Sequence, residues 1–184
     1  MRERLVIIPT YDEKENIRDI VSHVIGLRPE FHVLVVDDNS PDGTGAIVKQ
    51  MQQEWPNRLH LLERKGKQGL GTAYIAGFQW AIAQDYQYVF EMDADFSHDP
   101  NDLVRLYEAC STGGADMSVG SRYVKGGHVR DWSWDRILMS FTASLYVRII
   151  LWLGVRDTTA GFVCYKLHVL KALPLDRIKF IGYA

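Results

Sequence analysis

The sequence predicts a single α/β domain, because short apolar strands alternate with amphipathic helices along the chain. The 184 residues are 47% hydrophobic and 24% charged, with a net charge of −2. This composition is typical of a globular domain and excludes a disordered or collagen-like chain. It also argues against a nucleic-acid partner, since proteins that bind nucleic acids are usually basic. Acidic segments follow two predicted strands, which is typical of a ligand site at the carboxyl edge of an open α/β sheet.

Apolar runs predict strands at residues 5–8, 33–36, 59–62, 88–92 and 117–119. The first helix is predicted from apolar residues spaced three and four apart, namely Ile17, Ile20, Val21, Val24 and Ile25. Asp12 and Glu15 have the spacing of a reciprocal cap at its start. Further helices are predicted over about 44–54 and from the glycine-rich loop to about 83. Another is predicted to start with Asp99 as N-cap and Pro100 at its first position.

The N-terminus and the cysteines bear on the cellular compartment. The apolar run before Pro9 is too short for a signal peptide. Cys110 and Cys164 show neither a CxxC pattern nor Cys/His spacing. We therefore expect reduced, buried thiols in a cytosolic protein.

The stretch Arg136–Leu153 is long and apolar. Its polar residues would form one narrow stripe on a helix, since they recur at every fourth position: Arg136, Ser140, Ser144 and Arg148. The segment is marginal in length for a membrane span and contains Arg148. Three interpretations stay open: a buried or oligomer-facing helix, a span, or a helix lying in the membrane interface. In the last case the interfacial anchors would be Trp132, Trp134 and Trp152.

Carboxylates gather after two of the predicted strands. Asp37 and Asp38 follow the second strand, and Asp93 and Asp95 follow the fourth. In an extended segment residues i and i+2 point the same way, so Asp93 and Asp95 can reach one site. Two such carboxylates suit Mg²⁺ or Mn²⁺ bound together with a diphosphate. The alternative is a turn with solvated carboxylates.

The glycine-rich loop at 65–71 precedes a predicted helix and either binds phosphate or forms a tight turn. It matches neither a P-loop nor a dinucleotide fingerprint, which argues against a P-loop kinase and a Rossmann dehydrogenase. His98 lies just before a helix start, where a capping or orienting role is favoured over metal ligation. Arg122, with Lys125 and Arg130 nearby, either binds phosphate or lies in a solvated loop. No Ser/His/Asp set, cysteine nucleophile or zinc spacing stands out.

Six motifs occur in a characteristic order: PTYDEKEN at 9–16, VDDNSPDGT at 36–44, GLGTAY at 69–74, MDADFSHDP at 92–100, GSRY at 120–123 and DTTAGF at 157–162. Together they resemble the dolichol-phosphate mannosyltransferase (polyprenol monophosphomannose synthase) branch of the family-2 glycosyltransferases, in a bacterial form. The resemblance covers nearly the whole chain. It implies one catalytic domain over 1–184 with the GT-A fold, a Rossmann-like three-layer arrangement with a mixed, mostly parallel sheet.

The resemblance also implies an activity. The enzyme would move mannose from GDP-mannose to the phosphate of a polyprenol, with inversion at the anomeric carbon and with Mg²⁺ or Mn²⁺. A phosphate nucleophile is already anionic, so no strong general base is needed. Catalysis would then rest on positioning and charge stabilisation. Alternatives are the same scaffold using UDP-glucose or another nucleotide sugar, a nucleotidyltransferase, and a non-catalytic lipid-binding protein.

Motif positions assign the site residues implied by the resemblance. The nucleotide pocket would be lined by Pro9, Tyr11 and Glu13. The base and ribose would be contacted by Val36 and Asp38. The diphosphate and metal would lie at Asp93, Ala94 and Asp95, with Asp93 and Asp95 as metal ligands and Asp95 also catalytic. Ser121 would face the acceptor phosphate, and the catalytic Arg122 would face either the acceptor phosphate or the donor diphosphate. Many relatives carry an arginine where this chain has Val163, so Lys166 is predicted as a substitute phosphate ligand.

A lipid acceptor implies work at a membrane surface. We therefore expect a cytoplasmic protein that is peripheral on the cytoplasmic face, with residues 136–153 as an amphipathic acceptor element. In the family, the segment corresponding to 182–184 is followed by a further stretch with an aromatic-Gln-x-Glu motif. We therefore expect this chain to be truncated at its C-terminus.

Overall fold

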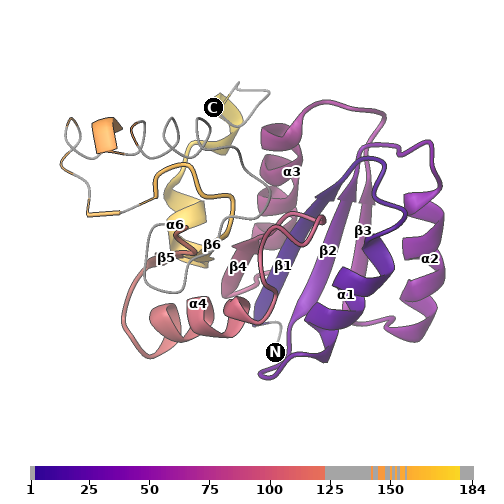
Figure 1. The fold of residues 1–184 in the computed structure, drawn as a ribbon, viewed down its shortest axis with the longest axis horizontal. Coiled ribbons are helices and arrows are strands. Elements are labelled where there is room, and N and C mark those ends of the chain that lie inside the picture. The colour runs from indigo at the N-terminus through magenta and orange to yellow at the C-terminus, as the bar shows by residue number, and fades with distance from the viewer. Residues whose placement is uncertain are drawn as a thin grey trace.

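The computed structural model describes residues 3–122, 142, 145–147, 150, 152, 154–155 and 157–178. These residues form a six-stranded sheet with helices on both faces (Figure 1). The strand order is β3-β2-β1-β4-β6-β5. The predicted α/β class is therefore confirmed.

Four neighbouring strands are parallel: β1 (Arg4–Thr10), β2 (His32–Asp37), β3 (Leu59–Glu63) and β4 (Tyr88–Glu91). β6 (Val163–Lys166) pairs antiparallel with β4, and β5 (Met117–Val119) pairs antiparallel with β6. The sheet is mixed and mostly parallel, as the resemblance implies. β6 is a strand that the sequence reasoning missed.

The helices form two layers around the sheet. Helices α1 (Ile17–Gly26), α2 (Thr44–Glu54) and α4 (Asp102–Ser111) contribute to one apolar cluster. Helices α3 (Leu70–Ala83) and α6 (Leu167–Ala172), with the 3₁₀ helix Leu175–Arg177, contribute to the other. Alternate residues of β1 face opposite clusters: Val6 and Ile8 face the first, and Leu5 and Ile7 face the second. The strands thus read as continuous apolar runs because both faces are covered.

Helix α3 lies unusually close to β1 at Gly77. A Cβ added at this glycine would come within 2.7 Å of the Ile7 Cγ2 atom. Glycine is required there by packing, since Ile7 is fully buried and has no room to move.

Two predicted helix starts are wrong by a few residues. Asp12 does not cap α1, because its backbone has a positive φ of 62° and the helix begins five residues later. The turn before α1 instead has the Ile17 amide donating to the Glu13 carbonyl at 2.9 Å. Helix α4 begins at Asp102 because Pro100 and Asn101 form a turn, in which the Asp99 carboxylate accepts from the Asn101 amide at 3.0 Å. The five apolar residues predicted to face the sheet from α1 are all buried, as expected.

Cys110 and Cys164 are buried free thiols, which confirms that part of the prediction. They lie where α4 packs on β6, and the Cys110 thiol is 4.0 Å from the Cys164 carbonyl oxygen. Burial raises the pKa of the Cys164 thiol, and the neighbouring Cys110 adds to the shift. Such thiols are unreactive at neutral pH.

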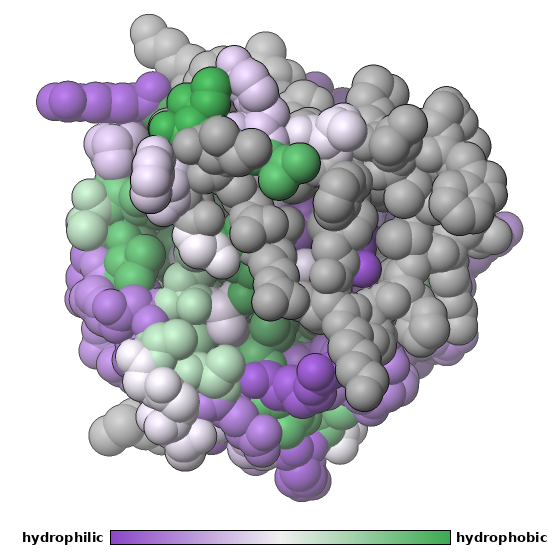
Figure 2. All heavy atoms as spheres, turned by 60° about the vertical axis from the view of Figure 1, so that its left-hand side comes forward, coloured by the Kyte–Doolittle hydropathy of each residue, from purple (hydrophilic) through white to green (hydrophobic). Residues whose placement is uncertain are grey.

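Most of the predicted 136–153 helix lies outside the described residues. Residues 142, 145–147 and 150 are helical, and several large apolar side chains are exposed: Leu145, Tyr146, Ile150 and Trp152. Figure 2 brings this side of the molecule forward and shows hydrophobic side chains at its surface. Within the described part of the chain, no helix has the length and apolar character needed to cross a membrane.

Candidate active site

The candidate site lies at the edge of the sheet where the four parallel strands end. The loops that follow these strands are residues 11–16, 38–43, 64–69 and 92–98, and they carry most of the predicted site residues. The strand order β3-β2-β1-β4 places these loops side by side in space, in the order 64–69, 38–43, 11–16 and 92–98. A ligand at this edge can therefore contact residues far apart in the sequence.

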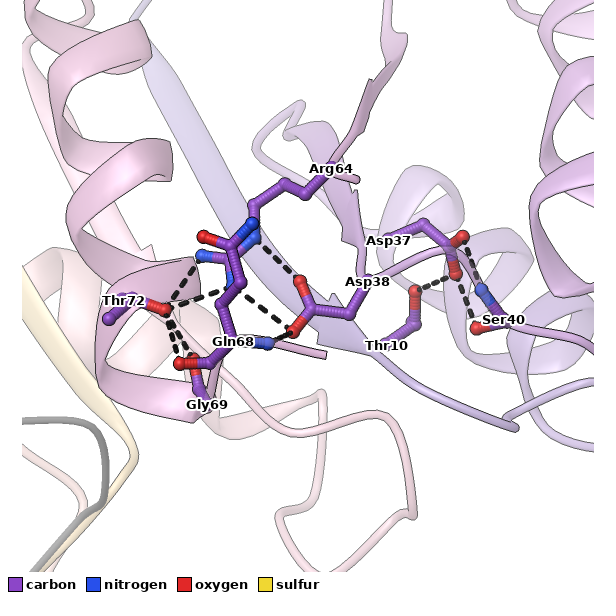
Figure 3. A network of polar contacts seen from close by, with 8 residues as sticks. All are labelled: Thr10, Asp37, Asp38, Ser40, Arg64, Gln68, Gly69 and Thr72. Carbon is purple, nitrogen blue, oxygen red and sulfur yellow. Dashed lines mark hydrogen bonds and ion pairs between the residues drawn. The ribbon is translucent and has the colours of Figure 1, made fainter. Parts of the chain in front are cut away.

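Asp37 fixes the turn after β2 and is almost fully buried, with 2% exposure. Its carboxylate accepts hydrogen bonds from the Thr10 hydroxyl at 2.9 Å, the Ser40 hydroxyl at 2.6 Å and the Ser40 amide at 3.0 Å (Figure 3). These bonds tie the end of β1 to the turn after β2. The acceptor capacity of Asp37 is largely used within the protein, so its role is structural.

Asp38 points the other way and binds the loop after β3 (Figure 3). Its Oδ1 lies 2.6 Å from the Arg64 Nε, and its Oδ2 accepts from the Arg64 Nη2 at 3.1 Å and the Gln68 amide at 2.9 Å. Arg64 also donates to the Thr72 hydroxyl, at 3.0 Å from Nη1 and 2.9 Å from Nη2. The Asp38–Arg64 ion pair is buried, with side-chain exposures of 7% and 9%. Contact of Asp38 with a nucleotide stays a prediction.

The loop after β1 is bound to the turn after β2. The Glu13 amide donates to the Thr44 hydroxyl at 3.1 Å, and the Lys14 amide donates to the Asp42 carboxylate at 2.9 Å. Burial raises the pKa of Glu13, and the negative charges of Asp95, Asp42 and Asp93 add to this, against a hydrogen bond from Asn16. Glu13 therefore lies in the same electrostatic field as the Asp93–Asp95 pair.

Three predicted nucleotide contacts lie below the surface of the site. Pro9 and Val36 are register partners in β1 and β2, and both are buried. Val36 is fully buried in the apolar cluster on the α3 side. Ala94 is also buried, with 3% exposure. Their side chains support the floor of the site, whereas Tyr11 and Glu13 are accessible from outside.

Asp93 and Asp95 lie two residues apart in the loop that follows β4. Asp93 accepts a hydrogen bond from the Tyr74 hydroxyl of α3 at 3.1 Å, and exposed Asp95 accepts from the Ser97 amide at 2.9 Å. Burial raises the pKa of Asp93, and the charge of Asp95 raises it further, against the opposing influence of His98 and Tyr74. A divalent cation would relieve this unfavourable burial of negative charge.

His98 joins this bend to the loop before β6. Its ring stacks on Phe162 with centroids 4.9 Å apart and planes 16° apart. Its Nδ1 is buried and has no hydrogen-bond partner within the described part of the chain. Burial lowers the pKa of His98, against the charges of Asp93 and Asp95, which favour the protonated ring. The predicted orienting role fits this packing better than metal ligation.

The Asp93–Asp95 pair fits Mg²⁺ or Mn²⁺ as a two-carboxylate site. Gly161 lies beside this pair, since an added Cβ would contact the Asp93 Oδ2 at 3.6 Å. No third histidine, cysteine or carboxylate joins the pair as a metal-binding group among the residues that the structure describes. Mg²⁺ is commonly held by one or two carboxylates, with substrate phosphates and water as its other ligands. The donor set therefore suits a metal bound together with a diphosphate.

Arg122 is held by the buried carboxylate of Asp157. Its Nε donates to the Asp157 Oδ2 at 2.7 Å, and its Nη2 donates to the Asp157 Oδ1 and to the Thr159 hydroxyl, each at 2.7 Å. The Asp157 side chain is fully buried. Burial would raise the pKa of Asp157, but the hydrogen bonds and charge of Arg122 outweigh it and hold that pKa below its usual value. Asp157 and Thr159 were not among the predicted site residues.

The prediction for Lys166 is not supported. Because β6 runs antiparallel to β4, Val163 pairs with Glu91 at the site edge, whereas Lys166 pairs with Tyr88 at the opposite edge. The Lys166 ammonium lies 3.5 Å from the Asp116 carboxylate. Val163 itself is buried, with 5% exposure, and offers no phosphate ligand. Of the predicted acceptor residues, Ser121 and Arg122 remain at the site edge.

Comparisons with known proteins identify the family of this chain. A family model described as glycosyl transferase family 2 matches residues 5–172. The chain is 48% identical to a polyprenol monophosphomannose synthase of Mycolicibacterium smegmatis, over 97% of this chain and 67% of that protein. It is 46% identical to an undecaprenyl-phosphate mannosyltransferase of Micrococcus luteus, over 97% of this chain and 72% of that protein. A dolichol-phosphate mannosyltransferase of Pyrococcus furiosus is 35% identical, and the chain spans about half of its length (49%).

Solved structures show the same fold. Glucosyl-3-phosphoglycerate synthase from Mycobacterium tuberculosis, solved with Mn²⁺ and uridine diphosphate, superposes with a TM-score of 0.66 at 17% identity. The match covers 94% of this chain and 59% of that one. TarS of S. aureus gives a TM-score of 0.61 at 21% identity, over 92% of this chain and 48% of that one. At these identities the likeness establishes the fold alone, which is the GT-A glycosyltransferase fold.

Proposed function

The chain belongs to glycosyl transferase family 2, in the polyprenyl-phosphate mannosyltransferase branch, and we propose that it transfers mannose from GDP-mannose to the phosphate of a polyprenyl phosphate. The relatives named above support mannose as the sugar and a polyprenyl phosphate as the acceptor. GDP as the nucleotide is our proposal.

One observation carries this proposal: the Asp93–Asp95 pair and the Arg122–Asp157 pair lie around the same side chain, His98. Gly161 would place a Cβ 3.6 Å from the Asp93 Oδ2 and 3.9 Å from the His98 ring. His98 lies in the electric field of all four charged groups. A metal-bound diphosphate and an anionic acceptor can therefore meet beside His98.

The proposed reaction joins an oxygen of the acceptor phosphate to the anomeric carbon of mannose. That bond forms as the bond from the anomeric carbon to the diphosphate oxygen breaks, with inversion, and GDP leaves with the bonding electrons. Mg²⁺ or Mn²⁺ on Asp93 and Asp95 would supply charge neutralisation for the departing diphosphate. Arg122 would orient the acceptor phosphate, because guanidinium donors match phosphate oxygens in charge and geometry.

No general base is required for this step. The acceptor phosphate is anionic at neutral pH, so no proton must leave its attacking oxygen. The protein's contribution is to align the two substrates and to balance their charge. Asp157 contributes by holding the Arg122 guanidinium with two bonds of 2.7 Å.

A lipid acceptor places the enzyme at a membrane surface. We propose peripheral association with the cytoplasmic face, through the exposed apolar residues Leu145, Tyr146, Ile150 and Trp152. Trp152 is 93% exposed, which is unusual for tryptophan and suits an interfacial anchor.

The function is tested by offering labelled GDP-mannose, UDP-glucose and other nucleotide sugars with undecaprenyl phosphate, membranes, and Mg²⁺ or Mn²⁺. We expect label in extractable lipid from GDP-mannose alone. Label from a UDP-sugar alone would contradict the proposed donor. If no donor supports transfer, although the protein is folded and binds nucleotide, the transferase proposal is wrong.

A further inference from the structure

Lys67 reaches across the candidate site and covers the face of Tyr11. Its ammonium lies 4.1 Å from the centre of the tyrosine ring. Lys67 belongs to the loop after β3, whereas Tyr11 follows β1, and β2 lies between these strands. The side chain therefore spans the end of β2, above the turn that contains Asp38.

The loop that carries Lys67 is fastened on both sides of it (Figure 3). Before it, Arg64 is paired with Asp38 at 2.6 Å. After it, the Gln68 amide donates to Asp38 at 2.9 Å, and the Thr72 hydroxyl donates to the Gly69 carbonyl at 2.8 Å. The same carboxylate thus holds both flanks of the loop. Because these anchors are buried or backbone contacts, the position of Lys67 is defined although its own side chain is exposed.

Among the residues that the structure describes, no carboxylate forms an ion pair with the Lys67 ammonium. Arg64 is paired with Asp38, and Arg122 with Asp157. For Lys67, by contrast, the contact that the structure shows within its described part is the Tyr11 ring. The surrounding loops carry the acidic residues Glu13, Asp42, Asp93 and Asp95. An anionic ligand needs cations at such an acidic edge.

The strand order defines where such a ligand must pass. A nucleoside diphosphate extending from the turn after β2 to the carboxylates after β4 crosses the end of β1, since the order is β2-β1-β4. Tyr11 and the Lys67 ammonium lie at that crossing. We propose that Lys67 is a donor-binding residue, held over Tyr11 until its ammonium pairs with the diphosphate of the incoming nucleotide. This inference rests on the proposed function and adds a residue to its donor site.

The test compares binding of nucleoside diphosphates with binding of the bare nucleosides. Titration calorimetry or NMR with GDP, UDP, guanosine and uridine, in the presence of Mn²⁺, is done on the wild type and on Lys67→Met. Methionine keeps an apolar chain over Tyr11 but removes the charge. The matched control is Lys65→Met, which removes an exposed lysine from the same loop. Lys67→Arg tests rescue by a conserved charge.

We expect Lys67→Met to weaken binding of the better diphosphate about tenfold, the usual effect of losing one charge-assisted hydrogen bond. Nucleoside binding should change less than about twofold, and Lys67→Arg should retain most of the affinity. The wild type should also lose more diphosphate affinity with added salt than Lys67→Met does.

Several results would overturn this inference. If Lys67→Met binds the diphosphate as the wild type does, or if Lys65→Met has the same effect, Lys67 is not a donor ligand. If nucleoside and diphosphate binding fall equally, Lys67 only supports Tyr11. These outcomes leave the proposed function intact, whereas a wild-type protein that binds neither GDP nor UDP would contradict both.

Discussion

Replacing Asp157 with asparagine tests how Arg122 is held. Asparagine has the same size, but it is neutral and has only one side-chain acceptor atom. The buried Asp157 carboxylate receives the Arg122 amide at 3.1 Å and two guanidinium donors at 2.7 Å. Disrupting a buried charge pair costs about 3–5 kcal/mol. We expect the lower end, about 3 kcal/mol, because Arg122 keeps 17% exposure and the Thr159 hydroxyl as an acceptor.

The assay is urea and thermal unfolding of the wild type and the variant. A loss of about 3 kcal/mol corresponds to a decrease in Tm of roughly 6–12 °C for a domain of this size. The matched control is Asp116→Asn, which removes an ion pair of 3.5 Å at a carboxylate that is 65% exposed. It should cost about 0.5 kcal/mol or less. Equal losses in the two variants would refute the claim that Asp157 is a buried partner of Arg122.

Three further predictions concern packing, pH and the membrane. Gly77→Ala should lower the free energy of unfolding by about 1–3 kcal/mol, because the added Cβ would collide with Ile7. The control Gly26→Ala has open space around it and should not lower the free energy of unfolding. Equal effects of the two variants would contradict this packing. The pKa of Asp157 is lowered in the folded state, so the difference in unfolding free energy between the wild type and Asp157→Asn should be complete above about pH 4 and shrink as the pH falls further. Urea unfolding at stepwise lower pH measures this difference. A difference that stays constant with pH would refute the prediction. Ile150→Asp should weaken flotation with liposomes, and unchanged flotation would count against a membrane-facing role.

The parallel part of the sheet could be predicted because its signals are local. Continuous apolar runs mark strands covered on both faces, and the α1 periodicity selects the residues that are buried. The strand β6 could not be predicted in this way. Its four residues form a strand only because they pair with β4 and β5, which are distant in sequence. The same limit explains the error at Lys166, since the direction of β6 decides which edge it reaches.

The site was predictable where its residues follow a strand directly, as Asp93 and Asp95 do. Arg64 was missed because its partner Asp38 lies 26 residues earlier, in another loop. The signal for it was indirect: a carboxylate buried at a strand end requires a cation, and Arg64 immediately follows β3. Asp12 was assigned as a cap from local spacing, although its amide donates to the Ser40 hydroxyl 28 residues away. In each case a contact between distant segments decided the outcome.

The most direct test of the account is mannose transfer by the wild type and by two matched variants. Labelled GDP-mannose and undecaprenyl phosphate are supplied with Mg²⁺ or Mn²⁺, and label in extractable lipid is counted. We predict transfer by the wild type and by Asp116→Asn, and a loss of about 100-fold or more in Asp95→Asn with an unchanged unfolding curve. Near-normal transfer by Asp95→Asn would contradict the metal assignment, and no lipid-linked mannose from the folded wild type would contradict the central claim.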